Sequence, residues 1–140
     1  ELVEDAKAKG ARVLCGGETP EGPGYYYPAT VIDQLTDDMR LVMEEAFGPV
    51  ATIYRVKDRE EAIKVANQTT FGLSSAIWSQ DKAEQDYFIE HLQAGAVFVN
   101  GMTISYPELA FGGIKDSGFG RELSDAGIKE FCNLKTVWKA

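Results

Sequence analysis

The chain has 140 residues, of which 44% are hydrophobic and 26% are charged, a composition typical of a globular protein. A chain of this length buries roughly two-thirds of the surface that it exposes when unfolded, so we expect one compact domain. Its formal charge is −8. The basic residues are scattered among more numerous carboxylates, which excludes a partner bound through phosphate neutralisation, and we expect no nucleic-acid partner.

No apolar run approaches the roughly 20 residues that a membrane helix needs, and no basic-then-apolar signal segment opens the chain. The sequence therefore predicts a cytoplasmic protein without a membrane partner. Cys15 and Cys132 belong to no CxxC or Cys/His cluster. We expect two reduced thiols, and we predict neither a disulfide nor a metal site.

Six short stretches rich in β-branched and aromatic residues are predicted strands. They are residues 13–14, 29–32, 51–56, 75–78, 96–99 and 134–138. A helix is expected over residues 1–9. Because no capping residue stands before Glu1, this helix indicates that a further segment precedes it.

Two helices between these strands are predicted to begin with a capping-box pattern, in which Asp58 is followed by Glu61 and Asp81 by Glu84. The second helix is expected to end before Gly95, which can adopt the left-handed conformation common at helix ends. A further helix is expected near residues 124–131. This alternation predicts an α/β fold with a mostly parallel sheet flanked by helices, and ligand sites just after the strands.

The segment EEAFGPV precedes the predicted strand at residues 51–56 and places the carboxylate of Glu45 two residues from the ring of Phe47. A carboxylate can accept hydrogen bonds from both hydroxyls of a ribose, and a ring can pack on a flat heterocycle. These residues therefore suit a nucleotide site. The same residues are also consistent with two solvated glutamates before an ordinary turn.

A long loop is expected over residues 100–120, where the segment FGGIKDSGFGRE contains four glycines that permit unusual backbone geometry. A loop of this length without regular structure is usually functional or disordered. The segment lacks the Gly-Lys-Ser/Thr of a P-loop and the third glycine of a dinucleotide fingerprint. We predict a shaped turn. The simpler interpretation of this segment is a tight loop with a purely structural role.

Four segments in this order, EEAFGPV, FGLSSAIWS, FVNG and FGGIKDSGFGREL, resemble the C-terminal part of the aldehyde dehydrogenase superfamily, and the resemblance covers essentially the whole chain. The stretch from FVNGMTISYPELAFGG through EFCNLKTVW is most similar to the bacterial succinate-semialdehyde dehydrogenase branch. The resemblance implies oxidation of an aldehyde to a carboxylic acid. A thiolate adds to the carbonyl, hydride leaves to NAD or NADP, and water hydrolyses the thioester.

The resemblance also implies roles for particular residues. Glu45 matches the glutamate that holds the nicotinamide ribose, and Phe47 matches the aromatic residue that packs near the nicotinamide. Phe111 matches an aromatic residue of the substrate pocket. Ser105 falls in the substrate loop, where its hydroxyl could donate to a carboxylate or carbonyl at the far end of the substrate. Ala110 stands where the resemblance predicts proline, which frees the backbone before Phe111.

No catalytic residue is predicted in this chain. The nucleophile of the family lies in a Gly-Gln-x-Cys segment that neither Cys15 nor Cys132 resembles, so the chain alone is expected to be inactive. Residues 1–132 correspond to the C-terminal part of the catalytic domain. Residues 133–140 correspond to an oligomerisation strand, and the unpaired edge of such a strand predicts a homo-oligomer.

Two other function classes stay open on the sequence. One is a non-catalytic binding or scaffold domain derived from the same fold. The other is a thiol enzyme that uses Cys15 or Cys132, which would require a thiol of low pKa in an electropositive setting.

Overall fold

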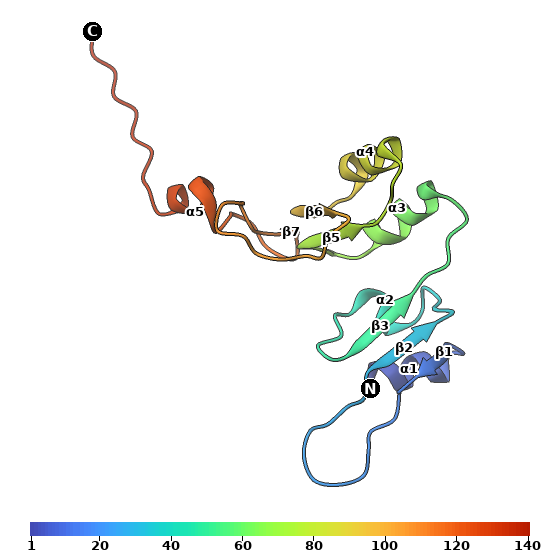
Figure 1. The fold of residues 1–140 in the computed structure, drawn as a ribbon. Helices are drawn as coiled ribbons and strands as arrows, with labels where there is room; N and C mark the ends of the chain where they lie inside the picture. Colours follow the sequence, from blue (N-terminus) through green and yellow to red (C-terminus); the bar gives the residue numbers. More distant parts are fainter. The chain divides into compact units, whose positions relative to one another are not determined.

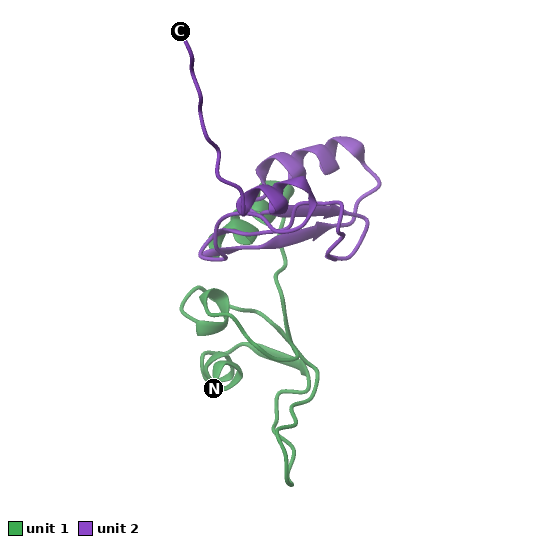
Figure 2. Cartoon of the chain, turned by 90° about the vertical axis from the view of Figure 1, so that its left-hand side faces the viewer, with its two compact units in different colours: residues 1–69 green, residues 70–140 purple.

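The computed structural model describes residues 1–140, and the chain forms two compact units, residues 1–69 and 70–140 (Figure 2). This arrangement differs from the single compact domain expected from the length. The fully buried large apolar side chains all belong to the first unit, and none belongs to the second. Chain length limits how much surface can be buried, but it does not decide how many cores share that surface.

The first unit is built on a three-stranded sheet with β2 in the middle (Figure 1). β2 pairs antiparallel with β1 and parallel with β3, with Thr30 opposite Val50 and Asp33 opposite Ile53. The elements in chain order are α1 (Leu2–Ala8), β1 (Arg12–Cys15), β2 (Thr30–Asp33), α2 (Arg40–Met43), β3 (Val50–Ile53) and α3 (Arg59–Gln68). β3 ends earlier than predicted, because β2 offers it no partner beyond Asp33.

The core of the first unit joins its sheet to α1 and to the segment around α2. It contains Val3 and Ala6 of α1, Ile32 of β2, and Met39 and Leu41. Ile32 and Ala6 are completely inaccessible to solvent. Full burial of a side chain the size of Ile32 contributes about 1.5–3 kcal/mol, so this cluster is what holds the small sheet to its helices.

Polar groups fix the base of the tyrosine-rich loop between β1 and β2. The buried hydroxyl of Thr30 accepts a hydrogen bond from the backbone N–H of Gly17 at 2.9 Å and donates to the carbonyl of Pro28 at 2.9 Å. Gly16 has a φ of +68°, and a Cβ there would overlap the carbonyl of Ala29. The two ends of the loop are therefore held together while the loop itself extends from the sheet (Figure 1).

The second unit contains a parallel β-α-β unit and a short antiparallel pair. β5 pairs in parallel with β6, with Ser74 opposite Ala96, and α4 connects them; β4 pairs with β7. The elements are β4 (Phe71–Gly72), β5 (Ser74–Ile77), α4 (Lys82–His91), β6 (Ala96–Val99), β7 (Ile114–Lys115) and α5 (Ser124–Glu130). The parallel pairs β2–β3 and β5–β6 confirm the α/β class, although they belong to separate small sheets.

Both predicted capping residues begin their helices. The carboxylate of Asp58 accepts a hydrogen bond from the backbone N–H of Glu61 at 2.8 Å. The carboxylate of Asp81 accepts from the N–H groups of Ala83 and Glu84 at 2.8 and 3.2 Å. A cap satisfies N–H groups that the helix itself leaves unpaired, so a local sequence pattern was sufficient to place these two helix starts.

The predicted role of Gly95 is wrong. α4 ends at His91, and Gly95 has no left-handed backbone conformation. Instead its N–H donates to the carbonyl of Gly72 at 3.0 Å, and a Cβ on Gly95 would overlap the carbonyl of Gly112. Gly95 is therefore required by a close approach of two backbone segments that lie far apart in sequence, which the local pattern could not show.

The predicted strand at residues 134–138 is not formed in the single chain. Residues 133–140 have no regular structure and leave α5 as an extended segment (Figure 1). Leu134 is 97% exposed and Trp138 is 83% exposed. A strand needs a neighbour to satisfy its backbone groups, and this segment pairs with none in its own chain. None of the helices is long and apolar enough to span a membrane.

We predict that Gly95→Ala destabilises the chain far more than Gly101→Ala. The Cβ at Gly95 would meet the Gly112 carbonyl, whereas the nearest atom to a Cβ at Gly101 is the Val99 carbonyl oxygen at 3.9 Å. Overpacking costs typically about 1–3 kcal/mol. Denaturant unfolding of the two variants checks this, and equal midpoints would contradict the close-approach role of Gly95.

Candidate functional site

The first candidate segment, Glu45 to Phe47, lies between α2 and β3 in the first unit. Two backbone hydrogen bonds shape it. The N–H of Gly48 donates to the carbonyl of Ala46 at 2.9 Å, and the N–H of Val50 donates to the carbonyl of Gly48 at 2.8 Å. The carbonyl of Pro49 accepts from the N–H of Thr30 at 2.8 Å, which ties the segment to β2. The predicted Gly-Pro turn is therefore present and anchored to the sheet.

The ring of Phe47 is 93% exposed and borders a pocket of about 370 Å³. The pocket is lined by Glu1, Leu2, Val3, Tyr25, Tyr27, Ala46, Phe47, Gly48, Pro49 and Val50. An exposed aromatic ring offers a flat apolar face on which another flat ring can pack. Phe47 thus has the exposure that its predicted role requires.

The two neighbouring glutamates have different surroundings. The guanidinium of Arg40 donates to both carboxylate oxygens of Glu44, at 2.6 and 2.8 Å. These hydrogen bonds lower the pKa of Glu44. The carboxylate of Glu45 is exposed and forms no hydrogen bond or ion pair within the chain. Glu45 is therefore the one of the pair whose oxygens can accept hydrogen bonds from a ligand.

This segment does not lie just after a strand, where the fold pattern led us to expect ligand sites. Glu45 and Phe47 precede β3, so they stand at the amino end of the strand. The turn that carries them is fixed by Pro49 and Thr30 at the start of the β2–β3 pair. The position of the turn follows from this hydrogen bond. The rule that ligands bind at the carboxyl ends of parallel strands does not apply to it.

In the second unit the predicted substrate loop does follow a strand, and Asn100 fixes its beginning. The Asn100 side chain accepts from the N–H of Ser79 at 3.0 Å and donates to the carbonyl of Ser79 at 2.9 Å. Its own N–H donates to the carbonyl of Ile77 at 2.7 Å. Asn100 therefore joins the ends of β5 and β6. The sequence analysis missed this role, although asparagine tolerates the φ of 54° found here.

The loop that follows exposes Ser105. The hydroxyl of Thr103 accepts from Ser74 at 3.5 Å, and the N–H of Leu109 donates to the carbonyl of Tyr106 at 3.0 Å. The carbonyl of Pro107 accepts from the N–H of Ser124, at the start of α5. The loop is therefore held on both sides of Ser105, whose hydroxyl is left at the surface.

The glycine-rich segment forms the predicted shaped turn, but it is not devoid of regular structure. β7 lies within it, and its two limbs are joined where the backbone groups of Phe111 and Glu122 exchange hydrogen bonds of 2.9 and 2.8 Å. Gly118 and Gly120 have φ values of +115° and +78°. These conformations favour glycine because it has no Cβ, so the segment folds back on itself as expected.

Phe111 borders a pocket of about 440 Å³ formed by this turn. The other lining residues are Leu73, Gly112, Gly113, Ser117, Phe119, Gly120, Arg121, Glu122, Glu130 and Phe131. Ser105 does not line it. Phe111 thus borders a pocket, and Ser105 lies outside that pocket.

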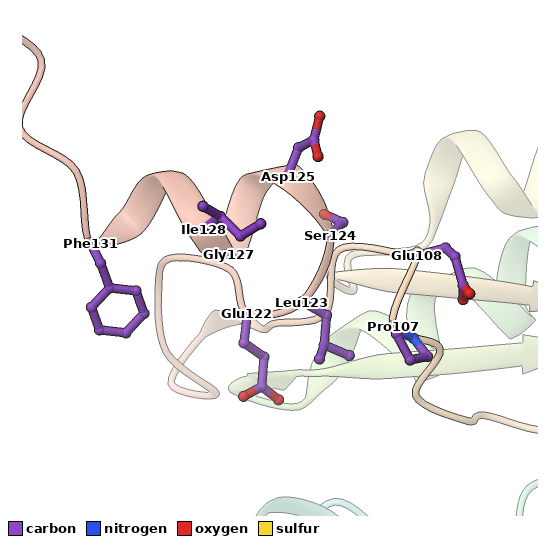
Figure 3. Close-up of a pocket in the computed structure, with 9 residues that line it drawn as sticks. All are labelled: Pro107, Glu108, Glu122, Leu123, Ser124, Asp125, Gly127, Ile128 and Phe131. Carbon is purple, nitrogen blue, oxygen red and sulfur yellow. The ribbon is translucent and has the colours of Figure 1, made fainter.

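A larger pocket of about 880 Å³ lies beside α5. Its walls are Pro107, Glu108, Glu122, Leu123, Ser124, Asp125, Gly127, Ile128 and Phe131. Figure 3 shows Glu122 and Leu123 directed to the same side, while Asp125 points the other way. None of the predicted site residues belongs to it.

The two cysteines are free and exposed. Each contacts a backbone carbonyl, of Ala29 at 3.7 Å for Cys15 and of Ile128 at 3.5 Å for Cys132. A backbone carbonyl accepts a hydrogen bond from a thiol but does not stabilise a thiolate. The hypothesis of a thiol enzyme therefore gains no support from these contacts.

Comparison with known proteins identifies the family. The aldehyde dehydrogenase family matches residues 1–137 of the chain. The chain belongs to the aldehyde dehydrogenase family. This confirms the resemblance read from the four sequence segments, and it accounts for the α/β fold.

Several relatives in this family match nearly the whole length of the chain. Succinate-semialdehyde dehydrogenase [NADP(+)] 1 of Mycobacterium ulcerans is 62% identical over 97% of the chain. The crystal structure of succinic semialdehyde dehydrogenase from Streptococcus pyogenes in complex with NADP+ matches 99% of the chain with a TM-score of 0.92 and 39% identity. An NAD-dependent aldehyde dehydrogenase from Sinorhizobium meliloti matches 93% with a TM-score of 0.88 and 39% identity.

The chain spans a minority of each of these relatives. It covers 30% of the Mycobacterium ulcerans protein, 30% of the Streptococcus pyogenes chain and 26% of the Sinorhizobium meliloti chain. Glu45 and Phe47 belong to one compact unit, and Phe111 and Ser105 to the other. That these four residues serve one active site stays a prediction.

Proposed function

We propose that this chain is part of an NAD- or NADP-dependent aldehyde dehydrogenase that oxidises succinate semialdehyde to the carboxylic acid. The observation that carries the proposal is the anchored turn at Glu45 and Phe47, which presents an unpaired carboxylate beside an exposed aromatic ring in a chain of this family. The names of two similar relatives support the substrate and favour NADP.

The donor set at this turn fits a nicotinamide nucleotide. The Glu45 carboxylate can accept both ribose hydroxyls, because no group of the chain occupies its oxygens. The Phe47 ring can pack beside the nicotinamide and limit its rotation. The chemistry that a bound NAD or NADP supplies is acceptance of hydride from the aldehyde carbon.

The second unit is proposed to form one wall of the substrate site. Phe111 offers an apolar surface in the pocket of the glycine-rich turn, and the exposed Ser105 can donate a hydrogen bond to the distal carboxylate of the substrate. Neither group performs chemistry, and the predicted sites include no nucleophile. The chain alone is proposed to be inactive.

We predict that Glu45→Gln in the full-length enzyme slows hydride transfer roughly ten- to a hundredfold, because a loosely held ribose misplaces the reacting ring. Glu44→Gln is the matched control: it removes the negative charge that Arg40 contacts and should leave the rate unchanged. Single-turnover NADPH formation measures this effect. Equal rates for the two variants would refute the role of Glu45, provided that both melt like the wild type.

We predict that Ser105→Ala lowers kcat/KM for succinate semialdehyde roughly ten- to a hundredfold, the loss expected for a hydrogen bond to a charged group. Butanal, an uncharged aldehyde of the same length, should be oxidised equally by variant and wild type. Steady-state kinetics with the two substrates measures the difference. An equal loss with both would assign Ser105 a structural role, and a wild type without preference for the acid would refute the substrate.

The full-length protein is proposed to be a cytoplasmic homo-oligomer. The exposed segment at residues 133–140 supports assembly, because its apolar residues and backbone groups need a partner that residues 1–132 do not supply. Two free, exposed thiols suit a reducing compartment. Residues 133–140 are thus proposed to form the oligomerisation strand, and residues 1–132 to belong to the catalytic domain.

Removal of residues 133–140 from the full-length enzyme is expected to produce smaller species in sedimentation velocity. Lys135→Thr is the control and should leave assembly intact, because strand pairing depends on backbone groups. An unchanged sedimentation coefficient after the deletion would refute the oligomerisation role.

A further inference from the structure

Arg121 closes the glycine-rich turn with its side chain. Its Nη1 atom donates to the carbonyl of Gly113 at 2.9 Å and to the carbonyl of Gly120 at 2.6 Å. These carbonyls belong to opposite limbs of the turn, one on each side of β7 and the Gly118 bend. One guanidinium therefore joins the two limbs, next to the backbone hydrogen bonds between Phe111 and Glu122.

The same arginine is fixed by other contacts. Its backbone N–H donates to the carboxylate of Glu130 on α5 at 3.2 Å. A Cβ on Gly112 would lie 2.6 Å from the Gly120 carbonyl oxygen and 2.9 Å from Cδ of Arg121. The arginine stem thus lies against the backbone of Gly112, and only glycine leaves room for it there.

The clamp acts next to Phe111. Gly112 follows Phe111 directly, and the backbone pair between Phe111 and Glu122 lies one residue beyond Arg121. Ser117 ties the far end of the turn, where its hydroxyl accepts from the N–H of Gly72 at 2.9 Å. The end that carries Phe111 therefore depends on the Arg121 side chain and on two backbone hydrogen bonds. Because position 110 is Ala110, no proline ring fixes the backbone φ just before Phe111.

We infer that Arg121 is a positioning residue, which holds the two limbs of the glycine-rich turn together and so fixes the Phe111 wall of the substrate pocket. The inference rests on the proposed function. The carbonyl groups that the Arg121 side chain contacts are neutral, and Arg121 lines the same pocket as Phe111. Its contribution is to geometry, and it acts on the aldehyde through Phe111 without touching the nucleotide.

The test is a double-mutant cycle in the full-length enzyme with Arg121→Ala, Phe111→Ala and the double variant. Each single change is expected to lower kcat/KM for succinate semialdehyde by about ten- to a hundredfold, mainly through a raised KM for the aldehyde. The KM for NADP is expected to stay unchanged. The double variant should be no worse than Phe111→Ala, because a residue that acts through Phe111 has no effect once that ring is gone.

Two further variants complete the test. Lys129→Ala removes a positive charge from α5 and should behave as wild type. Arg121→Lys keeps the charge on a shorter stem with three donors and should recover part of the loss, and it replaces Arg121→Ala in the cycle if that variant does not fold. Multiplicative losses in the double variant, or a parallel rise in the KM for NADP, would overturn the inference. A wild-type enzyme that oxidises no aldehyde would instead refute the proposed function.

Discussion

The second unit depends on backbone segments that approach one another more closely than side chains would allow. The N–H of Gly72 donates to the hydroxyl of Ser117, and the carbonyl of Gly72 accepts from the N–H of Gly95. Gly95 in turn lies against the carbonyl of Gly112. These contacts connect β4, the start of β6 and the glycine-rich turn without a large buried side chain. Because the unit buries no bulky apolar residue, hydrogen bonds and close main-chain contacts determine the geometry of its pocket.

The first unit follows a different principle. A small apolar core holds β2 to α1 and α2, and the turn before β3 is attached to that core through Thr30 and Pro49. A rigid base therefore carries the exposed groups of Glu45 and Phe47. Preorganised groups hold a ligand with little loss of conformational freedom, which is a property that the proposed nucleotide-binding site requires.

Local patterns were sufficient where the determining interaction is local. Asp58 and Asp81 cap their helices because the acceptor and the N–H groups are within three residues of each other. The left-handed conformations of Gly118 and Gly120 likewise follow from a turn within one segment. Gly95, Asn100 and Arg121 could not be interpreted in this way, since each acts on residues that are distant in sequence or on the opposite limb of a turn.

The sequence by itself determined the family, the α/β class and the residue types of the candidate site, because these depend on residue order and local periodicity. Only the tertiary structure decided that the chain divides into two compact units and that residues 133–140 remain unpaired. Each of these outcomes depends on which groups meet in space. A backbone group finds a distant partner only when the chain folds, and local sequence patterns do not specify that partner.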